Sequence, residues 1–333
     1  MSERTVALPW LEAFADGWRA REAQGRLPHA VLLTGQPGVG KRAAAIWLAK
    51  RRLAIGDQES VPTYPAAVPE HADLRWVQKP EDKQSIGIDQ VRELIDALSL
   101  TSYGGGAKIA IIEPADIMTG EAANSLLKTL EEPPGDALLV LVADRLGRLP
   151  ATIFSRCQRI NVPAPPVSAG LAWLDRLRPG ADWSAALEIA GNAPLAAIAA
   201  LDTLEDTRAM ERELRALAEG RASPVDVAAR WAKMDPQVVF GWLGRQVQQC
   251  LYRLSDHARQ AGTGAIPDSV LKRMDRRNLF CYLDTINRLR GQPGGSYNLQ
   301  LALESVLIDW AGGLADYRSP FSPGGLLPVP AAR

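Results

Sequence analysis

The sequence predicts an α/β fold with a parallel sheet, followed by an all-helical region. Short apolar runs alternate with helical patterns over residues 30–162, an order typical of parallel sheets whose strands are buried on both faces. The first apolar run leads directly into a glycine-rich loop and then a helix. Beyond residues 163–166 the strand pattern ends, and helical periodicity continues from residue 168 to about 315.

Four apolar runs are expected to form the strands of this sheet. They are short and dominated by aliphatic side chains, and they occupy residues 30–34, 108–112, 137–143 and 160–162. Residues 55–84 are polar and contain several prolines, so we expect a surface excursion there.

Three helices are expected between these strands. Residues 41–54 are rich in Ala, Leu and Lys. Asp89 is the predicted N-cap of the second helix, whose apolar residues fall at i, i+3, i+4 and i+7, namely Val91, Leu94, Ile95 and Leu98. A glycine loop follows at residues 104–106, and residues 120–131 form a third helix that stops before Pro133.

Composition narrows the class of protein. The 333 residues carry 38 basic and 38 acidic side chains, so no global positive field attracts nucleic acid, and any DNA contact must be local or shared. The three cysteines lie far apart in the sequence, which predicts neither a zinc site nor disulfides and favours a reducing cytoplasm. No apolar run approaches the roughly 20 residues of a membrane-spanning helix.

A degenerate phosphate-binding loop follows the first strand. Gly35, Gly38, Gly40 and Lys41 match the pattern G-x-x-x-x-G-K-[ST], in which backbone N–H groups and the lysine bind phosphate. Arg42 takes the place of the Ser or Thr whose hydroxyl binds Mg²⁺. The loop is therefore predicted either to be vestigial or to bind ATP or ADP weakly, with Arg42 filling the phosphate site as a further alternative.

The acidic motif of a nucleotide hydrolase is also incomplete. The strand at residues 108–112 leads into Glu113, Pro114 and Asp116. Glu113 stands where an Mg²⁺-supporting aspartate is expected, and Pro114 where a water-activating glutamate is expected. Proline carries no acid group, so the role of general base is vacant. Glu113 and Asp116 are interpreted as polar groups at the end of a strand.

Two motifs farther along carry a family resemblance. Residues 124–134 read NSLLKTLEEPP, and Ser155-Arg156-Cys157 follow the third strand. This pairing resembles the clamp-loader branch of the AAA+ ATPases. By that resemblance, residues 1–162 form an AAA+ P-loop domain, residues 163–205 a helical lid, residues 206–318 a helical collar for oligomerisation, and residues 319–333 a flexible tail.

The resemblance also implies a function. In this family Arg156 would contact, across a subunit interface, the γ-phosphate of ATP bound by a neighbour. The chain keeps that arginine but departs from the active subunits at Arg42, at Pro114, at Ala143-Asp144 and at Pro194. The departures resemble the family's non-hydrolysing stator subunit, which is not an enzyme by itself but part of a DNA-directed DNA polymerase holoenzyme, a nucleotidyltransferase.

The implied partners are the tau/gamma ATPase subunits and the delta subunit in a hetero-pentameric ring, with the sliding clamp and primer-template DNA contacted through the complex. No required cofactor and no membrane partner are expected. The alternatives are an ATP-hydrolysing clamp-loader subunit with an altered Mg²⁺ site, and a stand-alone nucleotide-binding regulator. Without its surrounding motif, Arg156 would be interpreted as a surface residue in an ion pair. The motif favours instead the contact with ATP bound by a neighbour.

Two further sets of residues are open to two interpretations. Four cations near the second helix either form a solvated face or, as the family implies, face DNA: Lys79, Lys83, Arg92 and Lys108. Large aromatic side chains of the helical part are interpreted as core and interface anchors: Trp173, Trp183, Trp231, Trp242 and Trp310.

Overall fold

The structure of this chain is a computed structural model, and it describes residues 5–57, 60–81, 83–100, 106–255, 266–292, 297–314 and 317. Two compact units make up the chain, Met1–Leu204 and Glu205–Arg333, and each is described by itself. The predicted tail at residues 319–333 and most of the predicted glycine loop at residues 104–106 lie outside the described residues.

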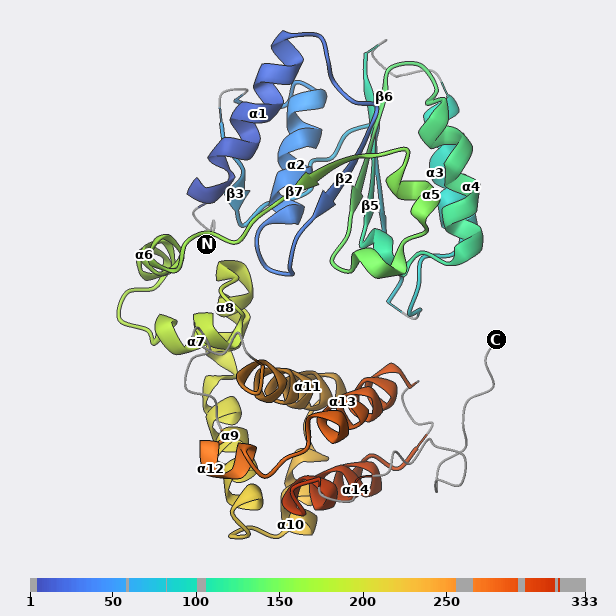
Figure 1. Cartoon of the computed structure of the whole chain (residues 1–333). Helices are drawn as coiled ribbons and strands as arrows, with labels where there is room; N and C mark the ends of the chain where they lie inside the picture. Colours follow the sequence, from blue (N-terminus) through green and yellow to red (C-terminus); the bar gives the residue numbers. More distant parts are fainter. Residues whose placement is uncertain are drawn as a thin grey trace. The chain divides into compact units, whose positions relative to one another are not determined.

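A five-stranded parallel sheet forms the centre of the first unit (Figure 1). Its strands, in spatial order, are β4 (Leu74–Gln78), β5 (Lys108–Glu113), β6 (Ala137–Val142), β2 (Ala30–Thr34) and β7 (Gln158–Asn161). Every residue of β2 and β6 is buried, which explains why these strands are continuous apolar runs. A separate antiparallel pair joins β1 (Val6–Ala7) to β3 (Thr63–Tyr64).

The edge strand β4 corrects the prediction for residues 55–84. This segment is not only a surface excursion, because β4 pairs in parallel with β5, with Leu74 opposite Ile109 and Gln78 opposite Glu113. An edge strand has one neighbour and is only partly covered, and of its five residues Leu74 alone is buried. Its sequence therefore lacks the apolar run that marked the central strands.

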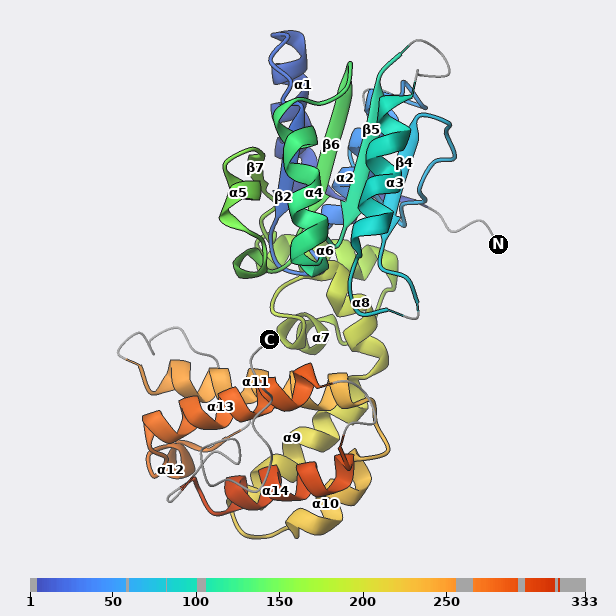
Figure 2. The ribbon, with the colours of Figure 1, turned by 90° about the vertical axis from the view of Figure 1, so that its right-hand side faces the viewer.

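Helices cover both faces of the sheet, as Figures 1 and 2 show. One face carries α1 (Glu12–Ala23) and α2 (Lys41–Arg52), and the other carries α3 (Ile88–Ser99) and α4 (Gly120–Glu131). Short helices complete the connections: η1 (Pro9–Leu11), η2 (Ala115–Ile117), η3 (Leu146–Arg148) and α5 (Ala151–Phe154). The predicted parallel α/β architecture is confirmed.

The start of α3 differs from the prediction. Gly87, not Asp89, is the N-cap, and its N–H donates to the side-chain oxygen of Gln90 at 3.2 Å. Asp89 lies in the first turn of the helix, where a carboxylate interacts favourably with the helix dipole. The preference of aspartate for both positions explains the two-residue error.

Three further helices belong to the first unit: α6 (Val167–Leu177), α7 (Trp183–Ile189) and α8 (Pro194–Asp202). Trp173 and Trp183 pack in the same core as α1 and α2, and the Trp173 indole donates to the carbonyl of Ala7 at 2.8 Å. Within the described part of the chain no single helix is long and apolar enough to cross a membrane; α7 and α8 pass that test only as a pair bent by 108°.

The second unit is entirely helical where it is described. It contains α9 (Leu204–Ala218), α10 (Pro224–Trp231), α11 (Pro236–Arg253), α12 (Asp268–Leu271), α13 (Arg276–Gly291) and α14 (Leu299–Ala311). Ser223 caps α10 and Asp235 caps α11, each accepting a backbone N–H of its helix. Each cap satisfies a backbone N–H that has no partner within its helix and so marks where that helix begins.

The tryptophans of the second unit are core residues. Trp231, Trp242 and Trp310 are at most 2% exposed, and the rings of Trp231 and Trp242 make an edge-to-face contact at 5.7 Å. Their interpretation as core residues is confirmed. Their interpretation as interface anchors is wrong, because these side chains do not reach the surface. Periodicity identifies apolar faces but does not say which face turns inward.

Candidate functional site

The degenerate phosphate loop connects β2 to α2 at the carboxyl edge of the sheet, the edge where parallel α/β folds bind ligands. Its glycines are required by close contacts. Gly35 has a φ of +140°, and a Cβ on it would lie 2.3 Å from the Val162 carbonyl oxygen; a Cβ on Gly38 would lie 2.5 Å from that of Ala196. The Leu195 N–H donates to the Gly38 carbonyl at 3.0 Å, so the start of α8 rests on the loop.

Lys41 is occupied by acceptors of its own chain. Its ammonium donates to the carbonyls of Gly35 at 2.5 Å and Gln36 at 2.7 Å and lies 2.7 Å from Asp144 Oδ1. The lysine side chain is 4% exposed. An ammonium has three N–H donors, and three acceptors surround it here, so no donor is left over for a phosphate in this state.

Arg42 is paired as well. Its Nη1 lies 2.5 Å from Glu113 Oε2, and its guanidinium is 5.2 Å from the ring centroid of Trp76, within cation–π range. Burial raises the pKa of Glu113 above its usual value, although the neighbouring Arg42 acts to lower it. A cation thus stands where the hydroxyl ligand of a metal was expected.

These groups line a pocket of about 480 Å³. The loop and the ends of β4, β5 and β6 form its wall. The charged side chains that line it are Lys41, Arg42, Lys79, Glu113 and Asp144. Three cations and two carboxylates therefore face one hollow of a size that small-molecule sites have. The structure brings together Gly38, Gly40 and Lys41 of the predicted site at this pocket, along with Arg42 and Glu113.

Asp144 was noted in the sequence only as a departure from the active subunits, and Trp76 was not noted at all, but both contact the cations of the site. Asp144 follows β6 by two positions, and the N–H of Asp144 donates to Oδ1 of the buried Asp116 at 3.0 Å. Asp116 therefore has a role, because it fixes the backbone that presents Asp144 to Lys41. An aspartate directly after an apolar strand is visible in the sequence, so Asp144 could have been identified as a site residue. Nothing in the sequence indicated Trp76, because β4, the strand that carries it, was not predicted.

Arg156 lies away from this pocket, in the turn between α5 and β7. Its Nε donates to Glu131 Oε1 at 2.6 Å, and Nη2 contacts the same oxygen. Its Nη1 donates to the Thr152 carbonyl at 3.1 Å and to Ser155 Oγ at 3.2 Å. Glu131 is the last residue of α4, so the ion pair joins the two motifs that carry the family resemblance.

The four cations near α3 do not form one solvated face. Lys108 is 8% exposed, and its ammonium donates to the carbonyls of Ala97 at 3.0 Å and Leu98 at 3.1 Å and also contacts that of Leu100. Lys108 therefore caps the carboxyl end of α3. It neither belongs to a solvated face nor is available to DNA, so both interpretations of this residue are wrong.

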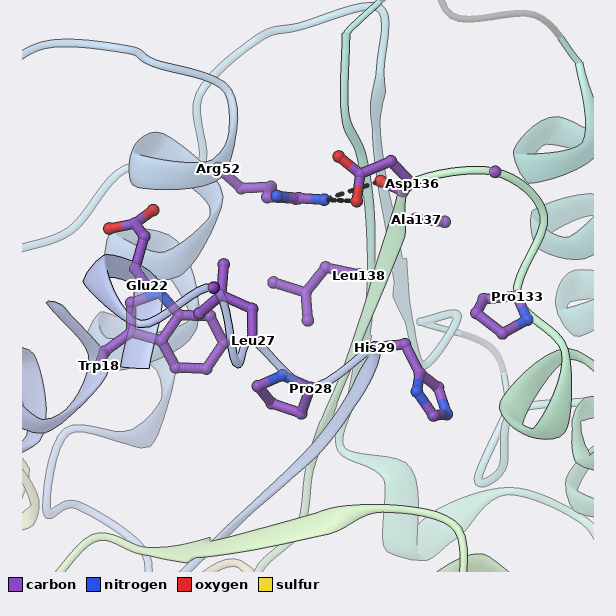
Figure 3. Close-up of a pocket in the computed structure, with 12 residues that line it drawn as sticks. Trp18, Glu22, Leu27, Pro28, His29, Arg52, Pro133, Asp136, Ala137 and Leu138 are labelled. Atoms are coloured by element: carbon purple, nitrogen blue, oxygen red, sulfur yellow. Dashed lines mark hydrogen bonds and ion pairs between the residues drawn. The ribbon is translucent and has the colours of Figure 1, made fainter. Parts of the chain in front are cut away.

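A second pocket, of about 260 Å³, lies at the amino edge of the sheet. Figure 3 shows Arg52 reaching Asp136 across it, with Trp18 and Leu138 as apolar wall. None of the predicted site residues lines it, whereas Gly38, Gly40 and Lys41 line the pocket at the phosphate loop, which is therefore the candidate ligand site. Among the described residues no three His, Cys, Asp or Glu side chains could hold a metal, and the absence of zinc stays a prediction that metal analysis can check.

Comparison with known proteins identifies the relatives of this chain. A family profile described as "DNA polymerase III, delta subunit" matches residues 11–166. The DNA polymerase III subunit delta' of Pseudomonas aeruginosa is 29% identical, over 91% of this chain and 97% of that protein. The chain is therefore similar to a delta-prime subunit of DNA polymerase III over most of its length.

Other delta-prime relatives match more locally. The subunit of Yersinia pestis is 34% identical over 57% of this chain and 59% of its own length, and that of Bacillus subtilis is 41% identical over 40% and 42%. A solved DNA polymerase III gamma-subunit-related protein from Thermotoga maritima is 19% identical, with a TM-score of 0.49 over 92% of this chain and 99% of that one.

Proposed function

We propose that this chain is a non-hydrolysing stator subunit of a DNA polymerase III clamp loader. In this role it helps to place a sliding clamp on primed DNA, assembles with tau/gamma and delta subunits in a pentameric ring, and donates Arg156 to ATP bound by a neighbour. The delta-prime and gamma/tau names of its relatives support the assembly.

One observation supports the proposal that this chain does not hydrolyse ATP. The Lys41 ammonium is surrounded by Asp144 and two loop carbonyls, so binding of a nucleotide must first break these contacts. Arg42, paired with Glu113, provides no hydroxyl for Mg²⁺, and Pro114 provides no base. Phosphoryl transfer depends on positioning and on charge neutralisation by metal and lysine, and both are deficient here.

The isolated chain tests this part of the proposal. Purified protein should turn over ATP no faster than a buffer blank, and Lys41→Ala should change nothing. Steady hydrolysis that disappears in Lys41→Ala would instead support an active ATPase subunit with an altered metal site. A chain that fails to co-purify with tau/gamma and delta would support a stand-alone regulator.

The trans role of Arg156 is tested in the rebuilt complex. Arg156→Ala should lower DNA-dependent ATP turnover and clamp loading without loss of assembly, because a guanidinium neutralises charge during phosphoryl transfer, an effect of roughly 10³–10⁵ at a single site and smaller in a ring with several sites. Arg156→Lys should restore little, since an ammonium lacks the planar fork. Arg159→Ala, at an exposed arginine on β7, is the matched control, and equal loss in both variants would contradict the role.

A further inference from the structure

Arg156 already has acceptors within its own chain for most of its donors. A guanidinium carries five N–H groups. The edge formed by Nε and Nη2 faces Glu131, and both N–H groups of Nη1 have acceptors in the turn, the Thr152 carbonyl and Ser155 Oγ. One N–H of Nη2 is left. In this state Arg156 has no free edge with which to grip a phosphate bidentately.

The contacts on the two sides of the guanidinium differ in kind. Thr152 and Ser155 belong to the same turn as Arg156, four and one residues before it, and hold Nη1 locally. Glu131 belongs to a different element, the end of α4. Loss of the Glu131 contact alone would leave the guanidinium tethered at Nη1 and free to present its Nε/Nη2 edge outward.

We infer that Glu131 is a gate on Arg156. It holds the Nε/Nη2 edge while the neighbouring site lacks a nucleoside triphosphate, and it gives up that edge to the γ-phosphate when one is bound. The inference rests on the trans role proposed above for Arg156 and makes Glu131 a positioning residue, since it acts through the arginine and does not touch nucleotide.

The exposure of the pair suits an exchange of partners. The Arg156 side chain is 30% exposed and that of Glu131 50%, and ion pairs this close to solvent contribute little, about a twofold to fivefold bias in an equilibrium constant. A triphosphate carries more charge than a carboxylate and offers several oxygens to the planar fork. The carboxylate can therefore retain the arginine at rest without competing strongly once the phosphate arrives.

The test compares complexes rebuilt with wild-type chain, Glu131→Gln, Glu131→Asp and the matched control Glu132→Gln, whose side chain is exposed one position beyond the helix. ATP turnover is measured with and without primed DNA and clamp. Removal of the charge in Glu131→Gln should raise turnover without DNA about twofold to fivefold and reduce the stimulation by DNA. Glu131→Asp, which keeps the charge, should return basal turnover toward wild type, and Glu132→Gln should match wild type.

The dependence on Arg156 distinguishes a gate from a structural role. In an Arg156→Ala background, Glu131→Gln should have no further effect on basal turnover. Unchanged basal turnover in Glu131→Gln, while Arg156→Ala lowers turnover, overturns the gate and leaves the proposed function standing. If Arg156→Ala itself has no effect, the proposed function fails and the gate fails with it.

Discussion

The Lys41 ammonium lies 2.7 Å from the Asp144 carboxylate, and this pair joins the phosphate loop to the end of the neighbouring strand β6. The lysine is almost fully buried, whereas Asp144 is 37% exposed. The lysine that would bind phosphate is thereby neutralised from within the chain.

Removal of that carboxylate should restore phosphate binding in part. Asp144→Asn keeps the side-chain shape but frees the charge of Lys41, so ADP should bind about tenfold more tightly than to wild type, equivalent to roughly 1.4 kcal/mol. The variant should also unfold more easily, by about 1–3 kcal/mol, because a buried donor loses a charged partner. Calorimetric titration and denaturant unfolding measure the two effects. Asp136→Asn, at the opposite edge of the sheet, is the control, and equal ADP affinity in all three proteins would contradict the blocking role.

Glu113 should make stability depend on pH. Burial raises the pKa of Glu113 in the folded state, so above its usual value of 4.5 the folded chain holds a proton that the unfolded chain has released. The contribution of Glu113 to the free energy of unfolding is therefore fully present below that pH and is lost as pH rises through the folded-state pKa.

Glu113→Gln removes this titration. Relative to wild type, the variant should gain free energy of unfolding as pH rises from about 4.5 through the folded-state pKa. Urea unfolding of both proteins across this range gives the comparison. Parallel stability curves would show that Glu113 titrates as it does in the unfolded chain.

Only one of the three cysteines should react rapidly in the folded chain. Burial raises the pKa of the Cys157 thiol to about 12 and that of Cys250 to about 11, so neither forms the reactive thiolate near neutral pH. Cys281 is exposed. Titration with a disulfide reagent at pH 8 should show one fast thiol, lost in Cys281→Ser, and three after unfolding. A fast second thiol in the native protein would mean that Cys157 or Cys250 is accessible.

The second unit should depend on its buried tryptophans for folding and not for contact with partners. Trp231 packs against Trp242, and its indole donates to Glu213 at 2.7 Å, so Trp231→Ala should cost about 3–5 kcal/mol in free energy of unfolding. Phe280→Ala, at a side chain that is 53% exposed, should stay within about 0.5 kcal/mol of wild type. Denaturant unfolding of the whole chain compares them; similar losses for both would contradict this distinction.

The sequence by itself determined the elements whose residues share one environment along their whole length. Apart from the terminal Glu113, every residue of β2, β5 and β6 is buried, so apolar runs at 30–34, 108–112 and 137–143 predicted these strands. The phosphate-loop glycines were predictable because their backbone conformations exclude most other residues. The edge strand β4 was not predictable, since an edge position imposes no apolar pattern.

Only the tertiary structure decided how the charged residues pair. Lys41 with Asp144, Arg42 with Glu113, and Arg156 with Glu131 each join side chains from different elements of the sheet domain. A sequence gives the charge of each residue but not its neighbours, because electrostatic interactions depend on separation and burial. The motifs therefore located the candidate site, and the fold determined that its Lys41 and Arg42 are already paired with carboxylates.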